Sequence, residues 1–284
     1  FYNALATFDP PAFEVKEAFG ELSIPIVKDL PLLRDLTVSG AARVSDYRGT
    51  AGRGWAYNGS VEWSPIEDLR LRANYGRAVR APNLDEQFSA AGQNFASVSD
   101  PCSSDNIGAG TQFREANCRA AGIPASYNYR YVQTLEIRTG GNPDLLVETS
   151  DSWTYGGVYR PSYVPGLSLS VDYYNIKVDD VISAVSAQGI INNCYDTPSI
   201  ENNQFCTLFQ RVGAGATGPN GEEAFRIIEG SLLQSSLNFA RLETRGIDAN
   251  LSYTRKIGDV RVSGQVIYTH LFSNNSFPHP PQPD

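Results

Sequence analysis

Hydrophobic and polar residues alternate with a period of two in segments of about ten residues or more along this chain. From Trp55 to Trp63, the odd positions are Trp, Tyr, Gly, Val and Trp, whereas the even positions are Ala, Asn, Ser and Glu. Successive side chains of a strand point to opposite faces, so the pattern predicts strands with one apolar and one polar face. It predicts about eight strands, near residues 13–27, 34–47, 54–64, 68–80, 146–160, 167–181, 236–255 and 259–273.

The aromatic residues of the apolar faces favour a membrane barrel over a soluble β-sandwich. Trp55 and Trp63 lie eight residues apart on one face, about 27 Å along a strand, or roughly 20 Å along the membrane normal for a strand tilted by ~40°. Small side chains at Gly59 and Val61 lie between them, as in a lipid-facing stripe that ends in aromatic girdles. The residues predicted to form the lipid-facing girdles are Trp55, Tyr57, Trp63, Trp153 and Tyr155.

The polar faces carry charged and amide side chains that suit a water-filled lumen. For each arginine on these faces, pairing with acids of neighbouring strands is a simpler explanation than contact with a substrate, because a site without a motif is weak evidence of binding. The residues predicted to face the lumen are Arg43, Glu62, Arg70, Arg72, Asn74 and Asp172.

The connections between the predicted strands differ in length in a regular way. Short links near residues 28–33, 64–68, 161–166 and 256–259 alternate with longer ones. Two connections, about 81–145 and 182–235, are very long, which is rare in compact soluble domains. Short periplasmic turns and long extracellular loops are typical of outer-membrane barrels. The predicted fold class is therefore all-β, a segment of a transmembrane antiparallel β-barrel.

Composition and charge exclude several classes of protein. No apolar run approaches the roughly 18 residues that a membrane helix needs. The chain has 31 acidic and 23 basic residues, and the net charge of −8 disfavours nucleic acid as a partner. Methionine is absent from the 284 residues, so we expect the chain to be a piece of a longer protein, with any secretory signal upstream of Phe1.

Four cysteines occur in two local pairs within segments rich in glycine, asparagine and serine. The pairs are Cys102 with Cys118 and Cys194 with Cys206. Local loops close at lower entropic cost than distant ones, so we expect these two disulfides and an oxidising compartment. Free thiols or a zinc site are the alternatives. The separations do not fit the usual zinc spacing, and neither His270 nor His279 completes such a pattern.

The sequence contains no arrangement that predicts catalysis. Residues 213–218 match G-x-G-x-x-G, but Pro219 and Gly221 follow where a dinucleotide site needs the start of a helix, so we interpret the segment as a loop. Paired acids such as Asp179 and Asp180 are more often solvated strand ends than acid/base pairs. We therefore expect a non-enzymatic protein with neither a cofactor nor a metal site. Residues 278–283 are interpreted as a loop or a chain end.

Several segments together resemble one protein family. Residues 75–88, YGRAVRAPNLDEQF, resemble the segment where a strand of TonB-dependent outer-membrane receptors leaves the barrel. Residues 141–145, GNPDL, followed by Glu148 and Ser150, resemble the start of the next strand. Residues 17–21, 171–176 and 238–248 also resemble family segments, in family order. The resemblance implies a partial receptor β-barrel domain over residues 1–284, without the plug domain and the last strands.

The family resemblance carries expectations about location and partners. In a 22-stranded barrel, as in plugged outer-membrane transporters, strand parity and family order suggest strands 12 to 19. The parent protein would lie in the bacterial outer membrane, contact lipid, couple to TonB through the plug, and import a siderophore, vitamin or oligosaccharide. Alternatives are a passive porin, a soluble β-sandwich module, and a structural or assembly role with other envelope proteins.

The first long connection is the predicted place of ligand recognition, because loops on rigid scaffolds often carry binding residues. Its polar residues are interrupted by Tyr129, Arg130 and Tyr131. Aromatic rings beside an arginine suit stacking on a sugar ring or pairing with an acidic chelate. Packing of the loop onto its neighbours uses the same side chains and is an equally simple explanation.

Overall fold

The structure is a computed structural model that describes residues 9–277 of the chain. His279 and the loop or chain end predicted for residues 278–283 lie outside the described residues. Two compact units make up the chain. Within the described residues, the sheet unit comprises residues 13–82, 146–182 and 238–277, and the loop unit comprises residues 9–12, 83–145 and 183–237.

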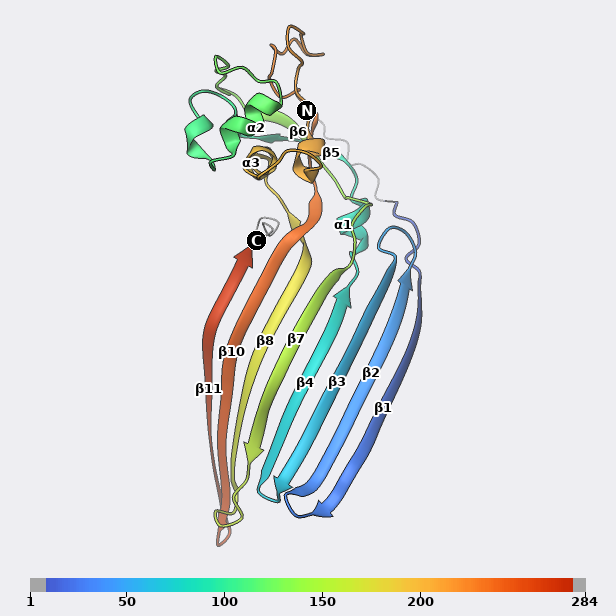
Figure 1. Cartoon of the computed structure of the whole chain (residues 1–284), viewed down its shortest axis with the longest axis vertical. Coiled ribbons are helices and arrows are strands. Elements are labelled where there is room, and N and C mark those ends of the chain that lie inside the picture. The colour runs from blue at the N-terminus through green and yellow to red at the C-terminus, as the bar shows by residue number, and fades with distance from the viewer. Residues whose placement is uncertain (1–8, 278–284) are drawn as a thin grey trace. The chain divides into compact units, whose positions relative to one another are not determined.

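The sheet unit is a single eight-stranded sheet in the order β1-β2-β3-β4-β7-β8-β10-β11, in which strands adjacent in the order lie side by side (Figure 1). The pairs β1–β2, β2–β3, β3–β4, β4–β7, β7–β8 and β10–β11 are antiparallel. All eight predicted strands are therefore confirmed, with ends shifted by a few residues. Their bounds are β1 Val15–Leu30, β2 Leu33–Tyr47, β3 Arg53–Ile66, β4 Leu69–Arg80, β7 Glu148–Tyr159, β8 Leu167–Ala184, β10 Ser236–Ile257 and β11 Val260–Phe277.

The register of the strands gathers the predicted residues on two faces. Trp63 pairs with Leu71, which pairs with Gly157, so the odd positions of β3, β4 and β7 share one face. Glu62 pairs with Arg72, which pairs with Gly156, so the even positions share the other. We name these the aromatic face and the polar face. All five residues predicted for the girdles lie on the aromatic face, and all six predicted for the lumen lie on the polar face.

The two ends of the sheet differ in their connections. Only a few residues join β1 to β2, β3 to β4, β7 to β8 and β10 to β11, all at one end. Since the strands alternate in direction, the connections from β4 to β7 and from β8 to β10 both leave the other end. These two long insertions form the loop unit.

The loop unit has secondary structure and a core of its own, whereas the sequence predicted only that its two insertions are long connections. A small sheet pairs β5 Gly92–Ala96 with β6 Leu135–Thr139, and β6 with β9 Leu232–Gln234. Its helices are α1 Leu84–Phe88, α2 Arg114–Ala120 and α3 Ala187–Tyr195, with short 3-10 turns η1 Ile107–Ala109 and η2 Gln204–Leu208. Within residues 9–277, no helix is long and apolar enough to cross a membrane.

The core of the loop unit is drawn from both insertions. Leu135 and Ile137 of β6 are almost completely buried, as are Ile190 and Ile191 of α3 and Phe205 of η2. The alternate residues of β6 and the adjacent pair on α3 place these apolar side chains inward. Because residues about 50 to 70 positions apart share this core, the two insertions fold as one body.

Candidate functional site

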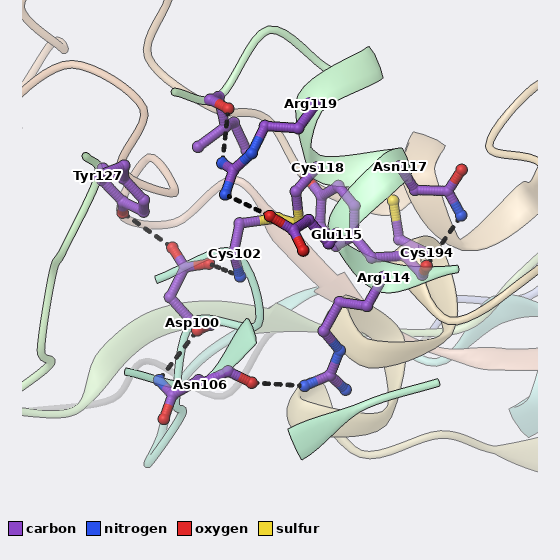
Figure 2. The surroundings of a disulfide bond; sticks show 12 residues. Asp100, Cys102, Asn106, Arg114, Glu115, Asn117, Cys118, Arg119, Tyr127 and Cys194 are labelled. Atoms are coloured by element: carbon purple, nitrogen blue, oxygen red, sulfur yellow. Dashed lines mark hydrogen bonds and ion pairs between the residues drawn. A yellow bond between two sulfur atoms is a disulfide. The ribbon is translucent and has the colours of Figure 1, made fainter. Parts of the chain in front are cut away.

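Both predicted disulfides are present in the loop unit. Cys102 is bonded to Cys118 of α2, with a Cα–Cα distance of 5.6 Å, as Figure 2 shows. Cys194 of α3 is bonded to Cys206 of η2, with a Cα–Cα distance of 4.8 Å. The alternatives of free thiols and of a zinc site are thereby excluded for this structure. Each bond closes a loop within one insertion, so each disulfide stabilises its own insertion and does not link the two insertions.

Peptide mapping under non-reducing conditions should recover one peptide pair joining Cys102 to Cys118 and another joining Cys194 to Cys206. The physical reason is the lower entropic cost of closing short loops. A reduced and alkylated sample of the same protein is the control, in which both pairs should separate. Recovery of a peptide that joins the two insertions, or of alkylated thiols without reduction, would contradict the pairing.

A buried ion pair joins the two insertions to each other. Asp100 is completely buried, and Arg211 donates two hydrogen bonds to its carboxylate, at 2.7 and 2.8 Å. The same carboxylate accepts from the backbone N–H of Cys102 at 3.0 Å and from the hydroxyl of Tyr127 at 2.9 Å, contacts visible in Figure 2. Burial alone would lower the pKa of Arg211, but its hydrogen bonds with Asp100 and the surrounding charges raise it. Arg211 therefore stays charged.

A second set of polar contacts, near the disulfides, also joins the two insertions. The side chain of Arg114 on α2 forms an ion pair with Asp196, with one Nε to Oδ1 distance of 2.8 Å. The amide of Asn117 donates to the backbone oxygens of Tyr195 and Thr197, at 2.9 and 2.6 Å. These polar groups are satisfied across the two insertions, which holds the insertions in one arrangement.

A hollow of about 570 Å³ opens beside this cross-link. It is lined by residues 97–100 and by the three residues predicted for ligand recognition, Tyr129, Arg130 and Tyr131. Ser103, Asp105 and Asn106 complete its lining. The hollow is large enough for a small organic ligand. The structure thus brings the predicted residues together around one concave space, and we name it the loop pocket.

Tyr129 and Tyr131 line the loop pocket, and contacts with neighbouring groups also hold both of them in place. Their rings meet edge to face with centroids 4.9 Å apart, and the guanidinium of Arg226 lies 4.0 Å from the centroid of Tyr129. The hydroxyl of Tyr131 accepts a hydrogen bond from the backbone N–H of Ile227 at 3.2 Å, and burial raises its pKa to about 12. Arg130 is exposed. Tyr131 therefore mainly fixes the loop, while Tyr129 and Arg130 are available to a ligand.

The G-x-G-x-x-G segment is a loop, as expected. A helix does not follow it, and Gly218 lies directly against the carboxylate of Glu222. Burial would raise the pKa of Glu222, but hydrogen bonds from the Asn220 side chain and from backbone amides outweigh burial and lower it to about 2. A carboxylate enclosed by the loop is the opposite of a phosphate cradle, because it would repel the anion. The segment is a structural turn.

On the sheet, the aromatic face ends in charged residues at the end from which the insertions leave. The rings of Tyr75 and Trp153 pack in a tilted arrangement with centroids 4.6 Å apart, and the next residues on the same face, Arg77 and Asp151, form an ion pair at 2.7 Å. Asp179 accepts from Arg241 at 2.8 Å and lies 2.9 Å from Lys177. We name this set the charged row. It consists of Arg77, Asp151, Lys177, Asp179 and Arg241.

Two of the three arginines predicted for the lumen pair with acids, in line with the simpler explanation. Arg72 donates two hydrogen bonds to Asp172, at 2.8 and 2.6 Å, and Arg70 lies 3.9 Å from Glu62. Arg43 and Asn74 line a shallow hollow of about 500 Å³, in which Arg43 lies over the ring of Phe19 at 5.8 Å. The pairs make the polar face hydrophilic and nearly neutral, which suits contact with water.

Comparison with known proteins identifies the chain. Residues 2–282 match the family described as TonB dependent receptor-like, beta-barrel. The chain belongs to this TonB-dependent receptor family. The receptor segment lies in the bacterial outer membrane, as the resemblance implied. Its eight-stranded sheet is part of a transmembrane antiparallel barrel, which it does not close on its own.

Two solved structures show the same fold at low sequence identity. The siderophore receptor PirA from Acinetobacter baumannii has a TM-score of 0.53 and 14% identity, with 90% of this chain and 27% of that chain covered. A mutant ferric enterobactin receptor, PfeA, from Pseudomonas aeruginosa has a TM-score of 0.54 and 16% identity, with 91% and 27% covered. This receptor segment therefore spans about a quarter of the length of either structure.

Sequence reasoning missed several residues that shape the loop pocket. Asp100, Arg211 and Arg226 were not singled out, because their contacts join residues up to 111 positions apart and no local pattern marks them. The charged row was also missed. It had a signal, since Arg77 and Asp151 continue the odd positions of Tyr75 and Trp153.

Proposed function

We propose that the chain is the wall and the ligand-capturing part of a receptor that imports a scarce nutrient with energy coupled through TonB. Membership of the TonB-dependent receptor family supports the role as barrel wall of a TonB-coupled importer. The loop pocket supports the role in ligand capture, since Tyr129, Arg130 and Tyr131 lie around one concave space on the proposed extracellular insertions. No catalytic step is part of the proposal, and the chain would act by binding and by forming the barrel wall.

The proposal includes the orientation of the sheet, with the aromatic face toward lipid and the polar face toward the lumen. Support comes from the order of side chains along the aromatic face. On β3 and β4, apolar residues such as Val61 and Leu71 are followed by Tyr57 and Tyr75 and then by Arg77. Aromatic rings are favoured at the membrane interface and charges at the headgroup level. The charged row would then mark the outer boundary of the hydrocarbon layer.

Replacing Tyr129 and Arg130 together with alanine in the intact receptor should weaken binding of its nutrient at least tenfold, a loss of about 1.4 kcal/mol. The nutrient would be the compound that supports receptor-dependent growth, and binding would be measured by titration of the purified receptor. Arg138→Ala removes another exposed arginine of the loop unit, one that does not line the loop pocket, and should leave affinity unchanged.

Uptake of the same nutrient in cells lacking TonB distinguishes the active receptor from a passive porin. We expect uptake to stop, because release from a plugged barrel needs an energy source. Uptake that continues without TonB would contradict the active mechanism. Unchanged affinity of the double alanine variant, with a correctly folded barrel, would place capture outside the loop pocket.

A further inference from the structure

The loop unit carries most of the net negative charge of the chain. Residues 83–145 and 183–237 contain twelve aspartates and glutamates, six arginines and no lysine, a net charge of −6 out of −8 for the whole chain. A surface of one sign raises the local concentration of opposite charges and repels like ones. The approach to the loop pocket is therefore unfavourable for a polyanion.

The arginines of the loop unit are largely engaged by its own acids and carbonyl groups. Arg211 binds Asp100, Arg114 binds Asp196, and Arg119 lies 3.5 Å from Glu115. Arg226 lies 3.7 Å from Glu229, besides stacking on Tyr129. Pairing of this kind leaves few cations to neutralise a charged ligand, and a buried charge without a partner is costly.

Inside the loop pocket, the ionic groups are balanced. Arg130 makes no hydrogen bond or ion pair with any residue that the structure describes, and it lines the pocket with Asp105. The charge of Asp100 is already matched by Arg211. One guanidinium and one carboxylate can donate to and accept from hydroxyl groups, with the strength of charge-assisted hydrogen bonds. They cannot neutralise several negative charges.

The rest of the lining suits hydroxyl groups and carbon–hydrogen faces. Ser97 and Ser99 supply exposed hydroxyls, and Asn106 supplies an amide. Each of these groups can both donate and accept hydrogen bonds. The ring of Tyr129 offers an amphipathic surface of the kind that packs against the apolar face of a ring. The shared chemistry is that of an uncharged, polyhydroxylated molecule.

We infer that the loop pocket takes an uncharged, hydroxyl-rich ligand, of the chemical class of a neutral oligosaccharide, and discriminates against polyanionic chelates. The inference rests on the proposed function and names the substrate class of its capture site. Discrimination has two sources, the −6 charge of the two insertions and the single unpaired cation of the pocket. Recognition would depend on Tyr129 for stacking and on Asp105 and Arg130 for hydroxyl groups.

Binding by the intact receptor to an array of neutral oligosaccharides, and to ferric enterobactin as a polyanionic probe, tests the inference. We expect saturable binding of at least one neutral oligosaccharide and none of ferric enterobactin. Tyr129→Ala and Asp105→Asn should each weaken binding of the oligosaccharide at least tenfold, whereas Arg138→Ala should leave its affinity unchanged. Affinity should change less than about twofold between low and high salt, since screening acts on charged ligands.

Three results would overturn the inference, and only the third also removes the capture site of the proposed function. If ferric enterobactin binds and Arg130→Ala abolishes that binding, the loop pocket captures ligand but its class is anionic. If no neutral oligosaccharide on the array binds, the inferred chemical class of the ligand is also wrong. If a probe binds and neither Tyr129→Ala nor Arg130→Ala affects it, the capture site itself lies elsewhere and the proposed function loses its pocket.

Discussion

Arg211→Ala should destabilise the loop unit by about 3–5 kcal/mol, the cost of breaking a buried ion pair by removing one partner. The reason is that Asp100 is completely buried and would lose the cation that pairs with its carboxylate. Hydrogen exchange of the intact receptor, followed peptide by peptide, would measure the change. Protection should fall in peptides from both insertions, because Arg211 and Asp100 lie on different ones.

Two further variants make this result specific. Arg119→Ala removes a more exposed pair with Glu115 in the same unit and should cost at most about 1 kcal/mol. Adding Asp100→Asn to Arg211→Ala removes the unpaired charge, so the double variant should be more stable than Arg211→Ala alone. Equal loss of protection in the single and double variants would mean that packing, rather than charge, explains the effect.

Val61→Arg should destabilise the folded receptor by roughly 2–4 kcal/mol, the cost of a cation on the lipid face near the bilayer midplane. Val61 lies on the aromatic face between Tyr57 and Trp63, and it pairs with Val38 and Ala73. Ser60→Arg is the matched control, since Ser60 is the adjacent residue and points to the polar face. It should be far milder. Urea unfolding of the detergent-folded receptor, read by gel mobility, compares the two, and equal costs would refute the orientation of the sheet.

The strands were predictable because a half-buried strand repeats every two residues, and that repeat survives in a single sequence. Trp55 and Trp63 alone mark the two ends of one stripe. The loop unit could not be predicted in this way. Its β6 and α3 are short, and their burial depends on a core shared between insertions. Tyr129 and Arg130 were found through their residue types, but Asp100 and Arg226 became visible only through contacts across the chain.

A missing side chain at Gly156 has a mechanical consequence for the barrel wall. Arg72 of β4 and Asp172 of β8 pair across β7, directly over Gly156, where an added Cβ would collide with Asp172 and with the backbone oxygen of Val171. The ion pair thus joins β4 to β8 across the intervening strand β7. A slip of β7 by one residue would move each of its side chains to the opposite face of the sheet, and in one direction it would bring Tyr155 to this position. Since Tyr155 would separate the two charges, the bridge penalises sliding of β7 and ties three strands into one shear-resistant panel.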